Sequence, residues 1–411
     1  MSESSPVYVN TNSTSSSKSS AIEGARTSID GLNLPIVQSI ILKGDFQNVV
    51  VTIPSSTTPS FGNFCFINVR DRNISLHNYS IQVVTSAITG TNVVGSYIPG
   101  YYWFDRIEEN LSSNNSTTFY GRENHTRLNS NQSDEDRYFS NIASGNYAST
   151  AQRTLMSSSS STNTFITSLS SLIDQSKLSF LNSSHNLELK VWFNNFSDIF
   201  VTTSGSNASA TILSCSLILN VTRLDTSTAM MRLNSLQTKN FHNIFHETCL
   251  TSMVVPIGSS AITIPLTSFV NSISHFYFTV RPSLTAFTGL GFYAFIPIAS
   301  YSLNDVSGNT ISNLISHQAA QILNKQNTQS SYMTENALNV VDNNVNIYTY
   351  SHSSDAVSAL NFGQLLGSRK YLGNETLTIN FKTTLVASML VEIFGYKECI
   401  LEQSISTIKR L

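Results

Sequence analysis

The chain has 411 residues and a net charge of −2, a length sufficient for two or three domains of about 150 residues each. Charged residues make up only 12% of it, about half the share of an ordinary soluble protein. Ser (68), Thr (40) and Asn (41) supply most of the polar groups. A hydrophobic share of 40% with 10% aromatics excludes disorder throughout the chain, and the small net charge disfavours duplex binding through many phosphate contacts.

The first residues are poor in apolar side chains. Residues 1–30 are rich in Ser, which predicts a flexible arm that could become ordered against a neighbouring molecule. The start of the chain lacks a basic segment followed by an apolar run, so we expect no secretory signal. The best candidate for a membrane span, 249–280, is interrupted by prolines and hydroxyl side chains and is more typical of strands and turns than of a spanning helix.

The four cysteines, Cys65, Cys215, Cys249 and Cys399, are far apart in the sequence. A disulfide-rich secreted module would show more of them in a shorter chain. We therefore expect buried free thiols and a reducing site of synthesis.

Short runs rich in Val, Ile, Thr, Phe and Tyr, bounded by Gly, Pro, Asn and Ser, predict strands along most of the chain. Many short strands at such spacing are typical of a β-sandwich or barrel. The runs are Val49–Ile53, Phe64–Val69, Tyr79–Val84, Trp103–Ile107, Leu187–Phe193, Ala210–Val221, Met253–Ile257, Ile262–Leu266, Phe276–Val280, Phe292–Ile298, Val345–Tyr350, Leu377–Phe381 and Leu385–Tyr396.

Three segments depart from this strand pattern. Apolar residues from Ile311 to Leu323 recur at helical spacing and predict a helix, with Asn309 or Thr310 as its N-cap. The polar segment 225–239 predicts a linker between two β domains of similar size, and 110–163 holds so little core material that it predicts a long loop excursion.

One pair of histidines has the spacing of metal ligands on a helix. His242 and His246 are four residues apart and Glu247 follows, so a shared metal ion is conceivable. In zinc proteases the Glu comes directly after the first His, and Asn243 holds that position here. A surface or interdomain segment is the favoured interpretation.

Other candidate sites are weaker. The segment 363–370 has the wrong glycine spacing for a phosphate loop and predicts a turn. Asp105, Glu108 and Glu109 could form a carboxylate pair, but Arg106 lies among them and favours an ion-paired rim.

The two tryptophans, Trp103 and Trp192, could stack on sugars, yet both lie in apolar runs that favour core packing. The sequence therefore predicts no catalytic, cofactor-binding or metal-binding residues and no cofactor. We expect a protein that is not an enzyme and acts through its surfaces.

Several segments, in their order and spacing, resemble the major capsid proteins of the double jelly-roll lineage, which includes adenoviruses, tailless lipid-containing phages, virophages and Polinton-like viruses. Ser96–Glu108 is similar to the aromatic strand that precedes a long loop in the first barrel of virophage-like capsid proteins. The segments similar to the second barrel are Ile264–Phe269, Phe276–Pro282, Leu303–Asn309, Tyr348–Ser351, Ala359–Gly363 and Leu377–Ile379.

This resemblance implies an all-β fold of two consecutive eight-stranded jelly rolls with long loop insertions and a short helix in the second. After the arm 1–30, the first jelly roll would span 31–225 with the excursion 110–163. The second would span 226–411 with an insertion at 303–346.

The function implied is that of a structural major capsid protein, made in the host cytoplasm, not secreted, and located in the virion. Its pseudo-hexameric homotrimers would tile an icosahedral shell. Implied partners are neighbouring copies, penton and minor capsid proteins, and an internal membrane reached by the arm 1–30; no specific nucleic acid is implied.

Two other functions stay open. A β-rich viral fibre or spike, or a lectin-like receptor-binding protein, would share this composition, although fibres usually show short repeats or a coiled-coil stalk. A carbohydrate-active enzyme on a sandwich fold would need two carboxylates across a cleft, and no pattern selects such a pair.

Overall fold

The structure is a computed structural model. The residues that it describes form mainly antiparallel strands, in four large sheets and one two-stranded sheet. The predicted all-β class is confirmed. The described residues are 46–69, 74–90, 93–95, 103–111, 116–121, 123, 143, 162–168, 187–202, 208–238, 240–283, 296–327, 346–352, 367–404 and 408–410.

The first barrel has two four-stranded sheets, in the orders β1-β10-β3-β7 and β2-β8-β5-β6. Numbered along the chain, its eight main strands stand in the orders 1-8-3-6 and 2-7-4-5, so the first and last strands are neighbours, as in a jelly roll of two Greek keys. A small sheet of β4 (Val93–Gly95) and β9 (Phe200–Thr202) lies beside α8 (Phe196–Ile199). The main strands are β1 (Phe46–Pro54), β2 (Phe64–Val69), β3 (Ile74–Thr85), β5 (Phe104–Leu111), β6 (Ser116–Tyr120), β7 (Asn163–Ser168), β8 (Leu187–Phe193) and β10 (Ile212–Leu224).

The second barrel repeats these two strand orders, as β11-β19-β13-β16 and β12-β18-β14-β15. In addition, β17 (Arg369–Leu372) pairs with β13, and β20 (Ile408–Arg410) pairs with β19. The prediction of two consecutive eight-stranded jelly rolls is confirmed. The main strands are β11 (Phe241–Val255), β12 (Ala261–Pro265), β13 (Val270–Pro282), β14 (Ile298–Asn304), β15 (Thr310–Ser316), β16 (Tyr348–Ser351), β18 (Thr376–Phe381) and β19 (Met389–Gln403).

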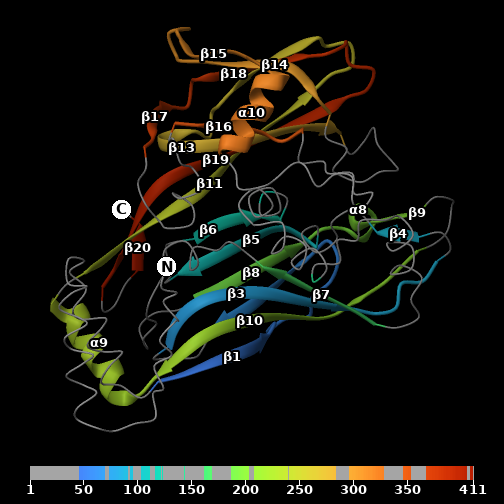
Figure 1. Cartoon of the computed structure of the whole chain (residues 1–411). Coiled ribbons are helices and arrows are strands. Elements are labelled where there is room, and N and C mark those ends of the chain that lie inside the picture. The colour runs from blue at the N-terminus through green and yellow to red at the C-terminus, as the bar shows by residue number, and fades with distance from the viewer. Residues whose placement is uncertain are drawn as a thin grey trace, which may run out of the picture.

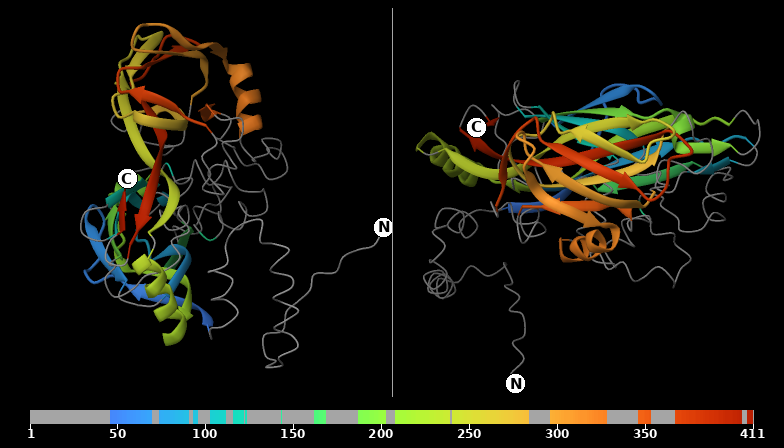
Figure 2. Two further views of the ribbon diagram at one scale, coloured as in Figure 1. Left: turned by 90° about the vertical axis from the view of Figure 1, so that its left-hand side faces the viewer. Right: turned by 90° about the horizontal axis from the view of Figure 1, so that it is seen from above.

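The four large sheets lie one above another as four layers (Figure 1). We call β1-β10-β3-β7 and β12-β18-β14-β15 the outer sheets of the first and second barrel, because they form the two ends of this stack. The sheets β2-β8-β5-β6 and β11-β19-β13-β16 are the inner sheets, and they face each other between the barrels. In the left view of Figure 2 the second barrel lies above the first, and in the right view, from above, it lies over the first.

Alternating side chains explain why these runs form strands with one buried face. In β8 the residues Leu187, Leu189, Val191 and Phe193 are buried, and the residues between them are half-buried, which is the period of a strand with one face on a core. The same alternation in β18 buries its Leu, Ile and Phe within the second barrel.

The predicted helix over 311–323 is wrong in its first half. Residues Thr310–Ser316 form β15, which pairs with β14, and α10 spans His317–Asn327. Ile311 and Ile315 pack against the core of the second barrel, and a run of Ile, Ser and Asn has modest helix propensity. Pairing with β14 therefore decides the conformation, and the caps expected at Asn309 or Thr310 do not apply.

The predicted linker contains α9 (Thr226–Thr238). The carboxylate of Asp225 accepts a hydrogen bond from the backbone N–H of Thr228 at 2.9 Å, which satisfies one free donor of the first helical turn. The predicted excursion 110–163 begins with a hairpin, because β5 continues to Leu111 and β6 pairs with it. The arm 1–30 and most of both predicted insertions lie outside the described residues, and the domain boundaries stay predictions.

A glycine in β19 marks the tightest packing in the second barrel. A Cβ on Gly395 would lie 2.5 Å from Cζ of Phe269 and 2.9 Å from Sγ of Cys249. The Phe269 ring is held edge-on against Phe276 and Tyr371, each with ring centroids 5.7 Å away, so it has little room to withdraw.

We therefore expect Gly395→Ala to lower the free energy of unfolding by about 1–3 kcal/mol, the usual cost of overpacking a core. Denaturation in urea would measure the change. Val386→Ala, at a side chain that is 90% exposed, is the control and should change stability by less than about 0.5 kcal/mol. If the Gly395→Ala variant were as stable as the wild type, this account of the packing would be contradicted.

Candidate functional site: the interface between the barrels

The outward face of the first barrel's inner sheet carries two rows of aromatic and charged side chains. One row joins Phe64, Trp192 and Arg106 across β2, β8 and β5. The next joins Phe66, Lys190 and Glu108 across the same strands. We call these six residues the aromatic platform.

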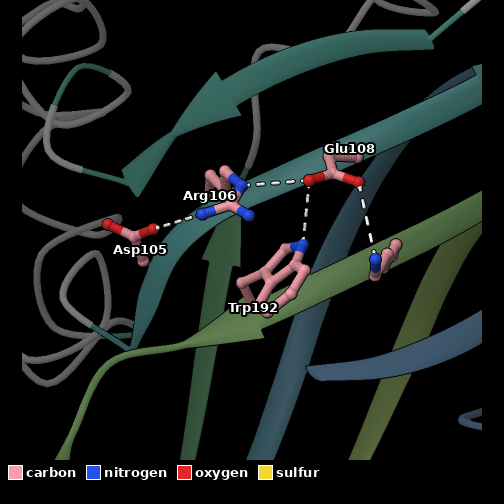
Figure 3. A network of polar contacts seen from close by, with 5 residues as sticks. Asp105, Arg106, Glu108 and Trp192 are labelled. Atoms are coloured by element: carbon pink, nitrogen blue, oxygen red, sulfur yellow. Dashed lines mark hydrogen bonds and ion pairs between the residues drawn. The ribbon is translucent and has the colours of Figure 1, made fainter. Parts of the chain in front are cut away.

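The polar groups of the platform are paired with one another (Figure 3). Oε1 of Glu108 accepts hydrogen bonds from Nε1 of Trp192 at 2.9 Å and from Nε of Arg106 at 3.0 Å. Its other oxygen lies 4.0 Å from Nζ of Lys190, and Arg106 also contacts the carboxylate of Asp105 at 3.0 Å. Half-exposed ion pairs of this kind stabilise a protein little, so their main effect is to fix the side chains in one arrangement.

Cations lie on the aromatic rings of the platform. Nζ of Lys190 is 4.4 Å from the ring centroids of both Phe64 and Trp192, and the guanidinium carbon of Arg106 is 4.2 Å from that of Trp192. Each such contact contributes about 0.5–1 kcal/mol at an exposed site. Burial alone would lower the pKa of Arg106, but the hydrogen bonds to Glu108 and Asp105 raise it overall.

The row that holds Arg106 continues into the contact with the second barrel. Tyr120 on β6 pairs with Arg106, and its ring centroid lies 6.1 Å from that of Phe394 on β19. Just beyond β6, Glu123 is fully buried and accepts a hydrogen bond from the hydroxyl of Tyr396 at 2.5 Å. The two barrels are thus joined by a ring contact and by a buried hydrogen bond.

The second barrel presents a buried polar face to this contact. The His275 ring stacks on Tyr396 at 4.4 Å with an interplanar angle of 12°. Tyr277 and Tyr396 are buried within the apolar cluster of the first barrel, so that cluster extends across the interface. On the same face of the sheet, Nε of Arg281 lies 2.8 Å from Oε2 of Glu392, and both side chains are almost fully buried.

No family model and no curated protein matches this sequence. Solved structures do match. The structure of VP54 of PBCV-1, fitted into a reconstruction of the virophage Sputnik, has a TM-score of 0.68 and 12% identity, covering 89% of this chain and 97% of that one. The Faustovirus major capsid protein has a TM-score of 0.62 and 7% identity, covering 87% and 90% of the two chains. The mavirus major capsid protein has a TM-score of 0.53 and 10% identity, covering 88% and 90%.

The chain has the double jelly-roll fold of viral major capsid proteins. At identities of 7–12%, the similarity shows a shared fold. The strand orders of both barrels agree with this fold, because they place the first and last strand of each barrel side by side.

The two tryptophans of this double jelly-roll protein lie in different environments. Trp103 is fully buried against Phe165 and Phe200, so the prediction of core packing is confirmed for it. Trp192 is half-exposed on the platform, so the same prediction is wrong there. The alternation of β8 carries the missed signal, because buried Val191 and Phe193 leave Trp192 on the opposite face.

The predicted ion-paired rim is correct for three of its residues. Asp105, Arg106 and Glu108 form the contacts described above. Glu109 instead points into the first barrel, where it is fully buried and accepts a hydrogen bond from the hydroxyl of Tyr79 at 3.4 Å. Successive residues of a strand face opposite sides, so Glu108 and Glu109 could not share one rim.

The two histidines of the possible metal motif lie on a strand, β11, where the helical spacing has no meaning. His242 is exposed, and its Nε2 lies 3.0 Å from Oε2 of Glu402. His246 is buried between the barrels, with its ring centroid 6.1 Å from that of His275. Among the described residues no group of three or more His, Cys, Asp and Glu side chains could hold a metal ion.

All four cysteines are free. Cys65 and Cys215, from different sheets of the first barrel, are both fully buried, and their hydrogen bond together with burial raises the pKa of Cys215 well above its usual value. Burial is also the main cause that raises the pKa of Cys249 to about 12. Thiols with such pKa values are protonated and unreactive at neutral pH.

The sequence predicted a turn at 363–370. The structure describes only 367–370 of this segment, and β17 begins at Arg369. Within the described part of the chain, no helix is long and apolar enough to cross a membrane.

The buried Arg281–Glu392 pair joins β13 and β19 on the face that carries His275 and Tyr396, and substitution tests its contribution to stability. Arg281→Met removes the ion pair at 2.8 Å from an almost fully buried carboxylate, so we expect it to lower the free energy of unfolding by about 3–5 kcal/mol. The double variant with Glu392→Met should recover most of that loss, because it removes both charges. Urea denaturation would measure both. If the double variant were as unstable as the single one, the pairing would not be the reason for the loss.

Proposed function

We propose that this protein is the structural major capsid protein of a virus, forming pseudo-hexameric homotrimers that tile an icosahedral shell. The observation that carries the proposal is the duplication: two barrels with the same strand order are joined by one buried interface in one chain. Three such chains would bring six equivalent barrels into a ring. A three-fold assembly would then have a nearly six-sided outline, which packs without gaps in a flat layer.

The composition supports this role. A permanent interface between subunits buries on the order of 2,000–5,000 Å² and resembles a protein core. Unpaired charge is costly in such an interface, and only 12% of the residues are charged. Two structures that share the fold are the major capsid proteins of Faustovirus and mavirus.

Other parts of the proposal concern location and partners. The protein would be made in the host cytoplasm and reside in the virion, in contact with neighbouring trimers and with penton and minor capsid proteins. The arm 1–30 would bind beneath the shell, to a neighbour or to an internal membrane. The insertions within 110–163 and 303–346 would project from the barrel ends as outer towers or as clasps between subunits, and we propose no enzymatic activity.

A lectin-like function has less support. Sugars stack on open aromatic faces, whereas the Trp192 ring is in contact with Lys190 and Arg106. These cations would have to move before a sugar ring could lie against the indole.

The oligomeric state tests the proposal. We expect the purified full-length protein to have three times the 45.1 kDa mass of the chain in light scattering at micromolar concentration. Negative-stain images should show hexagonal outlines or closed shells. A stable monomer at that concentration would contradict the proposal, and an elongated trimer that binds glycans would favour the fibre or lectin alternative.

A further inference from the structure

The first barrel holds two cysteines that approach each other from opposite sheets. Cys65 lies on β2 of the inner sheet and Cys215 on β10 of the outer sheet. Both are fully buried, and their thiols form a hydrogen bond with each other. Facing sheets normally lie about 10 Å apart, whereas a disulfide needs Cα atoms about 4.4–6.8 Å apart. The spacing of the sheets at this place therefore decides whether the contact can become a bond.

The two sheets converge where β1 leads into β2. The backbone N–H of Ser55 donates to the carbonyl oxygen of Cys215 at 2.8 Å, and that of Ser56 donates to the carbonyl oxygen of Phe66 at 2.7 Å. Two consecutive residues thus bind both sheets, one at Cys215 itself and the other at the residue after Cys65. Some Cα atoms of β2 and β10 lie within 8 Å of each other, which is closer than the usual separation of facing sheets. We call this place, at Ser55 and Ser56, the corner of the first barrel.

The other two cysteines lack this geometry. Cys249 lies opposite Gly395 on β19, and Cys399 lies four residues further along that strand. Four residues of a strand span about 13 Å, and cysteines whose Cα atoms are more than about 7 Å apart cannot be bridged without backbone movement. The four free cysteines therefore include one pair that can be joined, and the other two serve as an internal control.

We propose that Cys65 and Cys215 form a disulfide when the protein meets an oxidising environment, and that this bond holds the two sheets of the first barrel together. The inference goes beyond the proposed function, and only its timing rests on that function. A capsid protein made in the cytoplasm has reduced thiols, and it meets oxidants once the virion leaves the cell. The bond joins residues far apart in the sequence, so it constrains the unfolded chain strongly.

The reaction is thiol–disulfide exchange with a low-molecular-weight disulfide such as glutathione disulfide. The thiolate of Cys65 attacks one sulfur of the oxidant, which forms a mixed disulfide and expels one glutathione thiolate. The thiolate of Cys215 then attacks the sulfur of Cys65 and expels the second glutathione thiolate. The two cysteines lose two protons and two electrons in all, and the oxidant takes them up to become two glutathione thiols.

The order of attack follows from the surroundings of the two thiols. The hydrogen bond from Cys215 lowers the pKa of Cys65, burial opposes this, and a hydrogen bond with Ser55 lowers the pKa further, so the pKa is lowered overall. The thiolate is the attacking species, and Cys65 therefore reacts first. The hydrogen bond to Cys65 is the main cause that raises the pKa of Cys215, and this cause disappears once Cys65 is held in the mixed disulfide.

The oxidant reaches the buried sulfurs through local opening of the corner. The connection between β1 and β2 runs over the surface, where Ser56–Thr58 and Gly62–Phe64 are exposed. Exposed connections open at a lower free energy than the core of a domain. Opening at this connection uncovers Cys65, the second residue of β2, without unfolding the rest of the barrel.

Oxidation of the purified full-length protein tests the proposal. After incubation with glutathione disulfide, free thiols are alkylated under denaturing conditions and the protein is digested. Mass spectrometry should then detect a peptide pair that joins Cys65 to Cys215, with Cys249 and Cys399 alkylated. A parallel sample, refolded from urea in a glutathione redox buffer, removes any limit set by access to buried thiols. Absence of this link from both samples would overturn the proposal, and so would a predominant link between other cysteines.

The melting temperature tests whether the bond stabilises the barrel. The oxidised protein should melt about 5–10 °C above the reduced protein, and dithiothreitol should reverse the shift. Cys65→Ala should abolish the shift, whereas the double variant Cys249→Ala with Cys399→Ala should keep it. An equal or lower melting temperature of the oxidised wild type would show that the bond strains the corner, against the proposal. A shift that persists in Cys65→Ala would also overturn it.

The proposed function and this inference fail in different ways. A monomeric wild type contradicts the proposed capsid role, and the link between Cys65 and Cys215 can still be measured in that monomer. A trimeric wild type in which neither oxidation procedure joins the two cysteines contradicts only the disulfide.

Discussion

The packing of the two inner sheets against each other is the interaction on which the rest of this molecule depends. A single jelly roll has its own core, and nothing in its strand order fixes where a second one will lie. Here Tyr396 donates to buried Glu123 across the junction, and the apolar cluster of the first barrel continues onto the second through Tyr277. A buried acid needs a specific partner, so this contact favours one alignment of the barrels.

The fixed alignment of the two barrels also accounts for the distribution of charged side chains between the inner and the outer sheets. In most soluble proteins the charged side chains lie on the outermost surfaces. Among the strands that the structure describes, the inner sheets carry charged side chains in ion pairs and cation–π contacts, and the outer sheets are almost free of them. Polar pairing thus helps to specify the junction within the chain, whereas the outer sheets carry mainly hydroxyl, amide and apolar side chains.

Local pattern was enough to predict most of the strands, because apolar alternation reports which side chains face a core. The same alternation, applied residue by residue, would have placed Trp192 outside and Glu109 inside. The helix expected from Ile311 onward failed because apolar residues spaced for a helix face can also serve a strand, and the pairing of β15 with β14 decided between them. The pairing of the first strand with the last one in each barrel could not be derived from local pattern, since it joins residues far apart in sequence, such as Val51 and Leu219.

The layered distribution of charge becomes visible only after strands are assigned to sheets.

The most direct test of the central claim, that one chain supplies two barrels which meet through unlike sheets, is a cryo-electron microscopy map of the purified assembly at a resolution that separates strands. The account predicts that the two barrels of every chain meet through the 2-7-4-5 sheet of the first barrel and the 1-8-3-6 sheet of the second. A map in which like sheets meet, or in which the two barrels of a chain are not in contact, would contradict it.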